Sequence, residues 1–497
     1  MKVTIDKRDT IKNLLFLTLM LVLLIPGFQS RFGWIKEEPL TGAFKPPVDT
    51  GVKSLSVNSW FEGSYQELYD QDTRYKVGFR NLLIRLNNQV SYSLYDKANA
   101  EGVIVGKRNE LFEEDYIKEY VGQYYVGDSV WIKKAAKLKA VQDTLAKMGK
   151  TLVVIFEPDK ASFYPELIPS KYQRIAKQPS NYDVLSQKLK SAGVNVLDLN
   201  QYFISIKNKS EYPLFPQCGT HWSYYGSALA ADTAVSYIES LTKTDLPDIK
   251  IKANEVPDVP RHPDYDIGLA MNLMFTIPHP KTANPIIEIN NDKKRNLPDV
   301  LLVGDSFYFN WLNNRIPTKV FNTCDFWYYN KMITTSNGEQ RGKATDLDFR
   351  SEIEKRDIII IMVTGRFMHA FGWGFDEQLY ELFYPGNVNP VERFANEIRC
   401  YDDNFKRLYN QSVEMNVSLP FRIEEEAKYM FYEDSKLNPD KYTARRDILI
   451  IYEMGIRSSP EWLEQIKQKA VKNNISVEVQ IRRDAEWMYN DKYGKTG

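Results

Sequence analysis

A short apolar run that ends in a small polar turn constrains this chain more than any other feature. Residues 300–303 are four successive aliphatic residues, followed by Gly304, Asp305 and Ser306. A run without polar alternation predicts a central strand of a parallel sheet, because both faces of such a strand are covered. Gly304 allows a sharp turn, so Ser306 is expected at the carboxyl end of the strand, where open α/β sheets bind their ligands.

A serine in this position needs a base, because a free hydroxyl is a weak nucleophile at neutral pH. The chain has four histidines, and His221 lies in a loop of small and polar residues before a predicted helix. We therefore take His221 as the candidate base. Two structural interpretations stay open: His221 could be hydrogen-bonded for packing, and Ser306 could simply cap the helix that follows its strand.

Apolar segments elsewhere in the chain alternate with helical patterns. Strands are predicted at residues 151–156, 194–198 and 357–363, and helices at residues 60–95, 129–148 and 182–190. A strand with a turn and a short return is predicted at residues 102–112. This alternation is typical of a three-layer α/β domain with a mostly parallel sheet.

The amino-terminal segment has the pattern of a targeting sequence. Basic residues flank an apolar run at residues 14–25, which Pro26 and Gly27 close. The length suits a signal-peptide core and falls short of the ~20 residues that cross a bilayer comfortably. No small-x-small cleavage motif follows, so we predict an uncleaved signal-anchor with its basic end in the cytoplasm and the chain after about residue 30 exported. A cleaved signal peptide is the alternative.

Composition excludes several classes of protein. The formal net charge is +0, so nothing indicates nucleic-acid binding. The three cysteines, Cys218, Cys324 and Cys400, have neither a metal-ligand spacing nor the pattern of a disulfide framework, and we predict no metal and no cofactor. The predicted organisation is an anchor at residues 1–30, a linker at 31–57, an α/β domain at 58–400 and a mainly helical extension at 401–497. Residues 447–452 are one further strand candidate within that extension.

Five motifs occur in an order that resembles one family. They are Trp60-Phe61-Glu62-Gly63, the strand at 103–107, the segment at 158–165, Thr220-His221-Trp222 and Gly304-Asp305-Ser306. The order is similar to that of the DHHW-type SGNH hydrolase-like proteins, which include periplasmic alginate O-acetyltransferases. The resemblance implies an SGNH-like fold in permuted order, in which Ser306 is the nucleophile and His221 the base of a Ser-His-Asp triad.

The resemblance also implies a biological setting. Such a protein would move acetyl groups onto an exported or cell-surface polysaccharide, on the periplasmic side of the inner membrane, as a single-pass membrane protein. It would work beside a multi-spanning membrane O-acyltransferase that supplies the acetyl group. The alternatives are a carbohydrate esterase with the same Ser306 and His221, and a non-catalytic glycan-binding scaffold.

The expected triad aspartate is missing from its usual places. The family has an aspartate two residues before the histidine, where this chain has Gly219, and ordinary SGNH hydrolases have it three residues before, where this chain has Cys218. An acid from elsewhere could replace it, and the candidates are Asp198, Asp264, Asp266 and Asp305, of which Asp305 adjoins the nucleophile. Alternatively, Ser306 and His221 act as a dyad, or the protein is an inactive paralogue.

Substrate contacts are predicted near the same sheet edge. Arg366 follows the strand at 357–363 and Lys160 follows the strand at 151–156, so either cation could contact an acidic sugar. A salt bridge in its loop is an equally plausible role for Arg366, and a structural role is favoured for Lys160. Trp327 and Tyr328 belong to an aromatic group at residues 326–329. Sugar rings stack on such faces, although a buried core is the commoner use of aromatic residues.

Overall fold

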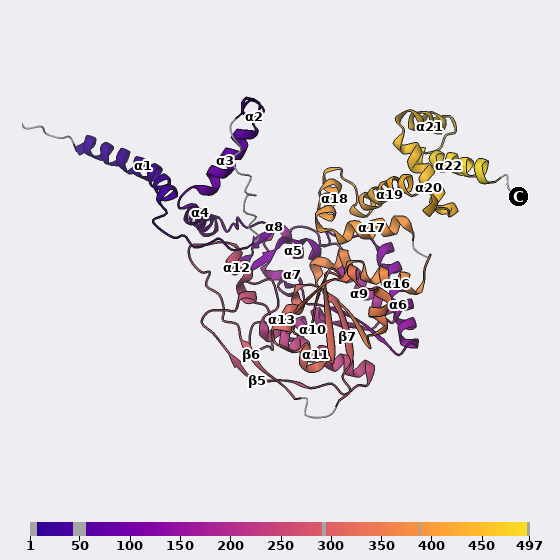
Figure 1. Cartoon of the computed structure of the whole chain (residues 1–497), viewed down its shortest axis with the longest axis horizontal. Coiled ribbons are helices and arrows are strands. Elements are labelled where there is room, and N and C mark those ends of the chain that lie inside the picture. The colour runs from indigo at the N-terminus through magenta and orange to yellow at the C-terminus, as the bar shows by residue number, and fades with distance from the viewer. Residues whose placement is uncertain (1–6, 43–55, 291–294, 387–388, 495–497) are drawn as a thin grey trace, which may run out of the picture.

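The computed structural model describes residues 7–42, 56–290, 295–386 and 389–494 (Figure 1). Helix α1 (Lys7–Phe32) projects from the body, and its stretch Arg8–Phe32 is long and apolar enough to cross a membrane by length and composition. A signal sequence passes the same test, so α1 is weak support for an anchor. Residues 43–55 of the predicted linker lie outside the described part of the chain. The predicted domain limits stay predictions.

The helical pattern at residues 60–95 corresponds to three helices, α2 (Val57–Phe61), α3 (Ser64–Lys76) and α4 (Arg80–Tyr95). They lead into an antiparallel pair, β1 (Val103–Val105) and β2 (Leu111–Glu113), which confirms the predicted strand and its return. Shorter helices in the body are α5 (Glu114–Tyr120), α8 (Ser170–Gln173), α12 (Asp266–Ala270) and α14 (Pro317–Val320).

A seven-stranded sheet forms the centre of the molecule. Its order is β10 (Gln340–Lys343), β9 (Met332–Thr334), β8 (Thr323–Tyr328), β7 (Asp299–Gly304), β11 (Ile358–Val363), β3 (Thr151–Phe156) and β4 (Val196–Asp198). Strands β8, β7, β11, β3 and β4 pair in parallel, and β9 and β10 add an antiparallel edge. The strands predicted at residues 151–156, 194–198, 300–303 and 357–363 are confirmed, whereas β8 to β10 and the hairpin of β5 (Ile249–Glu255) and β6 (Asn284–Ile289) were not predicted.

Apolar residues on both faces of the sheet explain its three layers. In β7, Leu301 and Val303 join one core with α6 (Asp128–Lys147), α9 (Asn181–Ala192), α15 (Phe349–Glu354) and α16 (Phe375–Phe383). Val300 and Leu302 join a second core with α7 (Lys160–Phe163), α10 (Leu199–Ile206), α11 (Tyr224–Thr242) and α13 (Phe309–Asn313). The missing alternation in residues 300–303 is therefore the consequence of helices on both sides, and the predicted α/β fold is confirmed.

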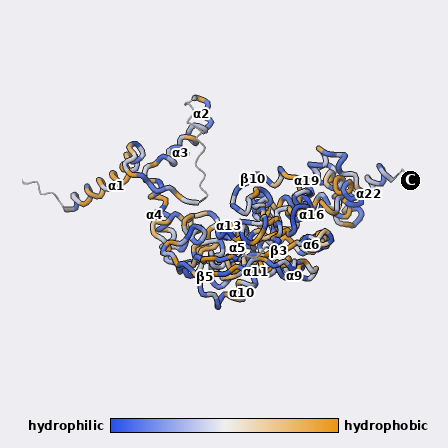
Figure 2. Tube along the Cα trace, turned by 60° about the horizontal axis from the view of Figure 1, so that its bottom comes forward, coloured by the Kyte–Doolittle hydropathy of each residue, from blue (hydrophilic) through white to orange (hydrophobic). Residues whose placement is uncertain are grey.

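The carboxyl-terminal extension is helical throughout its described residues. Helix α17 (Pro390–Cys400) leads into it, and it comprises α18 (Asp402–Glu414), α19 (Leu419–Leu437), α20 (Arg445–Ser458), α21 (Pro460–Lys472) and α22 (Val477–Tyr493). Helices α17 to α19 bury residues such as Phe405 and Phe431 in the first core, whereas α20 to α22 have a small core of their own around Ile466. Figure 2 shows the apolar residues concentrated inside the body and again along the projecting α1.

The strand predicted at residues 447–452 is wrong, because this segment lies inside α20. A short apolar run has no periodicity that separates a strand from a helix. The tertiary contacts decide it: Met454 and Ile456 of the same helix are buried, and Ile450 and Ile451 pack on the core from one side.

Candidate active site

The nucleophile candidate lies where the sequence predicts it. Strand β7 ends at Gly304, and the short 3₁₀ helix η4 (Ser306–Tyr308) begins two residues later. A Cβ atom on Gly304 would lie 3.1 Å from the carbonyl oxygen of Met362 on β11. A glycine therefore lets the two strands stay close at the point where the chain turns to present Ser306.

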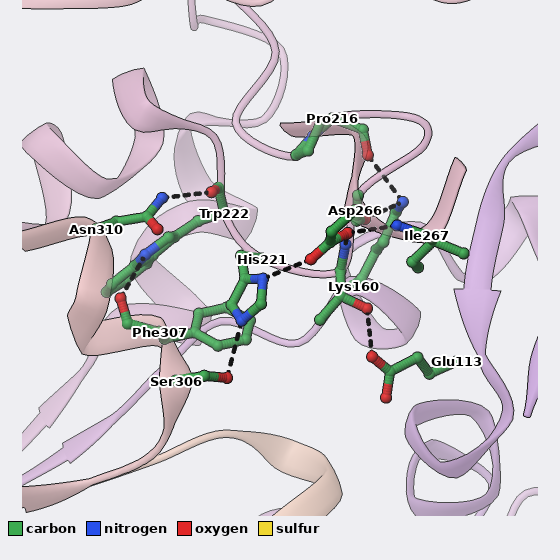
Figure 3. A network of polar contacts seen from close by, with 12 residues as sticks. Glu113, Lys160, Pro216, His221, Trp222, Asp266, Ile267, Ser306, Phe307 and Asn310 are labelled. Carbon is green, nitrogen blue, oxygen red and sulfur yellow. Dashed lines mark hydrogen bonds and ion pairs between the residues drawn. The ribbon is translucent and has the colours of Figure 1, made fainter. Parts of the chain in front are cut away.

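Ser306, His221 and Asp266 form one hydrogen-bonded chain (Figure 3). Ser306 Oγ lies 2.8 Å from His221 Nε2, and Asp266 Oδ2 lies 2.9 Å from His221 Nδ1. The three side chains come from the end of β7, from the loop before α11 and from the first residue of α12. Together they have the contacts of a Ser-His-Asp triad, in which the acid holds one ring nitrogen and the other faces the serine.

Backbone donors fix the carboxylate of Asp266. Its Oδ1 accepts hydrogen bonds from the backbone N–H of Thr220 at 2.9 Å and of Ile267 at 2.7 Å. Burial alone would lower the pKa of His221, but the hydrogen bond and charge of Asp266 outweigh it and raise that pKa above its ordinary value. The arrangement favours a proton on Nδ1, shared with Asp266, and leaves Nε2 to accept the proton of the Ser306 hydroxyl.

Asp305, which the sequence suggested as the orienting acid, does not contact the imidazole. Its Oδ1 accepts from the backbone N–H of Phe307 at 3.0 Å, and its Oδ2 accepts from the backbone N–H and hydroxyl of Thr364 at 3.0 and 2.9 Å. Asp305 thus ties the turn after β7 to the end of β11. Asp305 has extended backbone, in which neighbouring side chains point to opposite sides, so its carboxylate faces Thr364 while the Ser306 hydroxyl faces His221.

Two further candidates for the acid that orients His221, Asp198 and Asp264, also form no hydrogen bond with its imidazole among the described residues. Asp198 caps α10 and accepts the hydroxyl hydrogen bond of Tyr182. Asp264 is 2% exposed, and burial raises the pKa of its carboxyl to about 6. Asp266 was one of four open candidates, and no spacing rule singles it out, because it reaches the site from a short helix far along the chain from His221.

Packing explains why no acid stands directly before His221. A Cβ atom at Gly219 would lie 2.7 Å from Pro216 Cγ and 2.7 Å from the carbonyl oxygen of Pro263, so an aspartate does not fit there without a shift of the loop. Cys218 is 1% exposed, and burial raises the pKa of its thiol to about 12. A buried thiol of this kind is not a reactive thiolate.

The histidine loop is braced against the nucleophile turn by Trp222. Its indole N–H donates to the carbonyl oxygen of Phe307 at 3.1 Å, and Asn310 Nδ2 donates to the carbonyl oxygen of Trp222 at 3.1 Å (Figure 3). The rings of Trp222 and Trp311 stack with their centroids 5.8 Å apart. These contacts hold His221 and Ser306 at hydrogen-bond distance.

Lys160, predicted as a substrate contact, is instead a structural cation. Its side chain is 2% exposed, and Nζ lies within hydrogen-bond distance, 2.8 to 3.0 Å, of the carbonyl oxygens of Leu111, Pro216, Gln217 and Gly219, which share its three N–H donors. Glu110 Oε1 lies 2.8 Å from the same nitrogen. Lys160 therefore fixes the loop that carries His221 from beneath, and a sugar has no access to it.

Replacement of Lys160 by Met is expected to destabilise the protein by about 3–5 kcal/mol, because it leaves the Glu110 carboxylate and several carbonyl groups buried without their partner. Chemical denaturation measures the change, with Lys147→Met on the exposed face of α6 as the control. A Lys160→Met protein of wild-type stability that had lost glycan binding would contradict the structural role.

Of the other predicted substrate contacts, one is buried in the core and two are partly exposed. Trp327 is 1% exposed and belongs to the core, so the predicted sugar contact is wrong for this residue. Tyr328 is half-buried, and its ring stacks on that of Tyr329 with centroids 4.0 Å apart. Arg366 forms an ion pair with Glu113 and lies 3.6 Å from Asp115. Glu113 in turn accepts the hydroxyl hydrogen bond of Thr220 at 2.6 Å, which links Arg366 to the histidine loop.

The fold is an α/β domain with a hydrogen-bonded Ser-His-Asp chain at the carboxyl edge of its parallel strands. Residues 103–313 match the family described as SGNH hydrolase-like domain, acetyltransferase AlgX. This part of the chain is therefore similar to the AlgX-type SGNH hydrolase-like domain, in agreement with the resemblance that the order of its motifs suggested.

Two curated relatives are described as probable alginate O-acetylase AlgJ. The Pseudomonas aeruginosa protein is 27% identical over 216 residues, which cover 43% of this chain and 50% of the relative. The Pseudomonas putida protein is 26% identical over 130 residues, which cover 26% of this chain and 32% of the relative. This chain thus spans half or less of the length of each of these relatives.

Solved structures of similar proteins overlay loosely. The O-acetyltransferase domain of Pseudomonas putida AlgJ has a TM-score of 0.38 and 17% identity, covering 56% of this chain and 99% of that one. Pseudomonas aeruginosa AlgX has a TM-score of 0.33 and 15% identity, covering 56% and 57%. Bacillus cereus PatB1 has a TM-score of 0.32 and 10% identity, covering 49% and 92%. Overlays this loose support no functional argument.

Proposed function

We propose that this protein is an extracytoplasmic O-acetyltransferase that moves acetyl groups onto a cell-surface or exported polysaccharide. The observation that carries the proposal is the hydrogen-bonded chain Ser306–His221–Asp266 within an AlgX-type domain. The AlgJ relatives are described as alginate O-acetylases, which favours a polysaccharide acceptor.

The proposed reaction has two acyl-transfer steps. His221 Nε2 removes the proton of Ser306 as Oγ attacks the acetyl carbonyl of the donor, and the departing group takes that proton with it. The acetyl group is then an ester of Ser306. A glycan hydroxyl gives its proton to His221 and attacks the ester, and the proton returns to Ser306 Oγ as the acetylated glycan leaves.

Asp266 and the peptide backbone support both steps in this scheme. The Asp266 carboxylate stabilises the imidazolium that forms when His221 holds the proton. The backbone N–H of Ser306, at the first residue of η4, is the proposed donor to the negative oxygen of the tetrahedral intermediate. No step calls for a metal ion or an organic cofactor.

The membrane setting belongs to the same proposal. Helix α1 would anchor the protein in the inner membrane and leave the catalytic domain in the periplasm. An acetyl supplier on that side is required, and a multi-spanning membrane O-acyltransferase is the proposed partner. The carbohydrate esterase alternative uses the same three side chains with water in place of the glycan hydroxyl.

The test uses the full chain in detergent, a chromogenic acetyl ester as donor and a polysaccharide mixture as acceptor. We expect a mass gain of one acetyl group on the protein, release of the chromophore, and acetyl esters on the glycan detected by mass spectrometry. Chromophore release with free acetate as the sole acyl product, at a rate that added glycan does not change, would instead identify an esterase. A folded protein with no adduct and no turnover would overturn the proposal.

A further inference from the structure

A cavity of about 550 Å³ lies between the sheet and the helical extension, beyond the residues that match the AlgX-type domain. Its walls come from the turn between β8 and β9, from the 3₁₀ segment η6 (Gly365–Gly374) and from residues 399–404, where α17 ends and α18 begins. Three separate segments therefore build it, and the segment at residues 399–404 supplies the side that faces the extension.

The cavity lies at the edge of the sheet that carries the nucleophile. The backbone N–H of Tyr329, in its wall, donates to the carbonyl oxygen of Gly304 at 2.9 Å, two residues before Ser306. Arg366, in the same wall, is ion-paired to Glu113, which accepts the hydrogen bond of Thr220 beside His221. The cavity therefore lies at the same end of the sheet as the triad, joined to it by these two contacts.

Aromatic side chains line it in an unusual backbone setting. Tyr329 and Trp373 have φ angles of +52° and +47°, which bulky residues rarely adopt and which occur mainly at functional sites. Their ring centroids are 5.1 Å apart, and Asn330 Nδ2 donates to the carbonyl oxygen of Trp373 at 3.2 Å, which braces both segments. Tyr401, on the extension side of the cavity, is 50% exposed.

Cations accompany these rings. Lys331 is exposed, and its Nζ lies 5.2 Å from the ring centroid of Tyr401, so this pair connects the sheet to the extension. Arg399 is 6% exposed, and its Nε has no hydrogen-bond partner among the described residues. The neighbouring Asp376 is already paired with Lys134, and Asp402 in the cavity wall is paired with Lys406 at 2.8 Å.

A neutral histidine completes the wall. His369 is 3% exposed, its Nδ1 has no partner among the described residues, and burial lowers the pKa of its imidazole to about 4. A neutral imidazole offers a hydrogen bond to a hydroxyl group. Aromatic faces, cations and a neutral polar group in one cavity fit a ring that carries hydroxyls and a carboxylate.

We propose that this cavity is an acceptor subsite, completed by the helical extension, that binds an acidic sugar unit of the polysaccharide. Tyr401 stacks on the sugar ring, and Lys331 and Arg399 bind its carboxylate. The inference rests on the proposed function, because the bound sugar is an acetyl acceptor only if the protein is an acetyltransferase. Binding of the sugar itself does not require catalysis. The site would hold the polymer beside Ser306 while a neighbouring unit takes the acetyl group.

Binding of uronic-acid oligosaccharides to the full chain in detergent tests the subsite, with neutral oligosaccharides of equal length for comparison. We expect tighter binding of the acidic probe, and affinity at least about tenfold weaker in Lys331→Ala and in Tyr401→Ala. Lys343→Ala on β10 and Tyr429→Ala on α19, both exposed, serve as matched controls that keep wild-type affinity.

Equal affinity for acidic and neutral probes would overturn the inference, as would wild-type affinity in both cavity variants or no binding to the wild-type protein. The result is independent of the acyl-enzyme test. If the wild-type protein forms no acetyl adduct on Ser306 but binds the acidic probe more tightly, the proposed function is contradicted and the subsite is retained. If it forms the adduct but shows no preference for acidic probes, the subsite is contradicted and the proposed function is retained.

Discussion

Replacing Ser306 by Ala is expected to abolish the acetyl adduct and to lower turnover of an acetyl ester by roughly 10⁴–10⁶-fold, the range found when a nucleophilic serine is removed from a triad. The reason is that no other hydroxyl lies at hydrogen-bond distance from His221 Nε2 among the contacts of the described residues. Intact-protein mass measures the adduct and chromophore release measures turnover.

Ser205→Ala on the exposed surface of α10 is the matched control and is expected to keep both adduct and turnover. The Ser306→Ala protein is expected to stay folded, because the hydroxyl makes no contact in the two hydrophobic cores. An acetyl adduct that persists in Ser306→Ala would place the nucleophile elsewhere and would contradict the assignment.

Replacing Asp266 by Asn is expected to lower kcat by about 10³–10⁴-fold while leaving the fold intact. The amide occupies the same space as the carboxylate, but it lacks the charge that stabilises the imidazolium and favours the productive tautomer of His221. Steady-state kinetics with the acetyl ester measures the change. Asp264→Asn, two residues earlier, is the control, and its kcat is expected to stay close to that of the wild-type protein. A kcat of Asp266→Asn within a few-fold of wild type would mean that Ser306 and His221 act as a dyad.

The same variant changes the pH dependence in a defined direction. His221 is a base only when it is neutral, so activity falls as the pH drops through its pKa, and Asp266 holds that pKa above the ordinary value. Without the carboxylate the pKa falls, and the acid limb of the profile of kcat/KM is expected to move to lower pH. An unchanged acid limb would show that another group controls it.

The sheet was largely predictable because its strands are local signals. Residues 151–156, 300–303 and 357–363 are apolar runs bounded by polar residues or glycine, and each became a strand that both cores cover. The run at 447–452 has the same local appearance but became a helix, because its contacts are with neighbouring helices and not with a strand. Local pattern alone does not separate these cases.

By itself the sequence determined the strand that delivers Ser306, the loop that carries His221 and the family that these motifs resemble. Only the tertiary structure decided which acid completes the chain, because Asp266 approaches from a separate short helix and Gly219 is too crowded for the expected aspartate. Burial likewise decided that Lys160 and Trp327 are structural, since exposure depends on what other segments cover. A triad is a contact between distant segments, and such contacts are set by packing rather than by spacing.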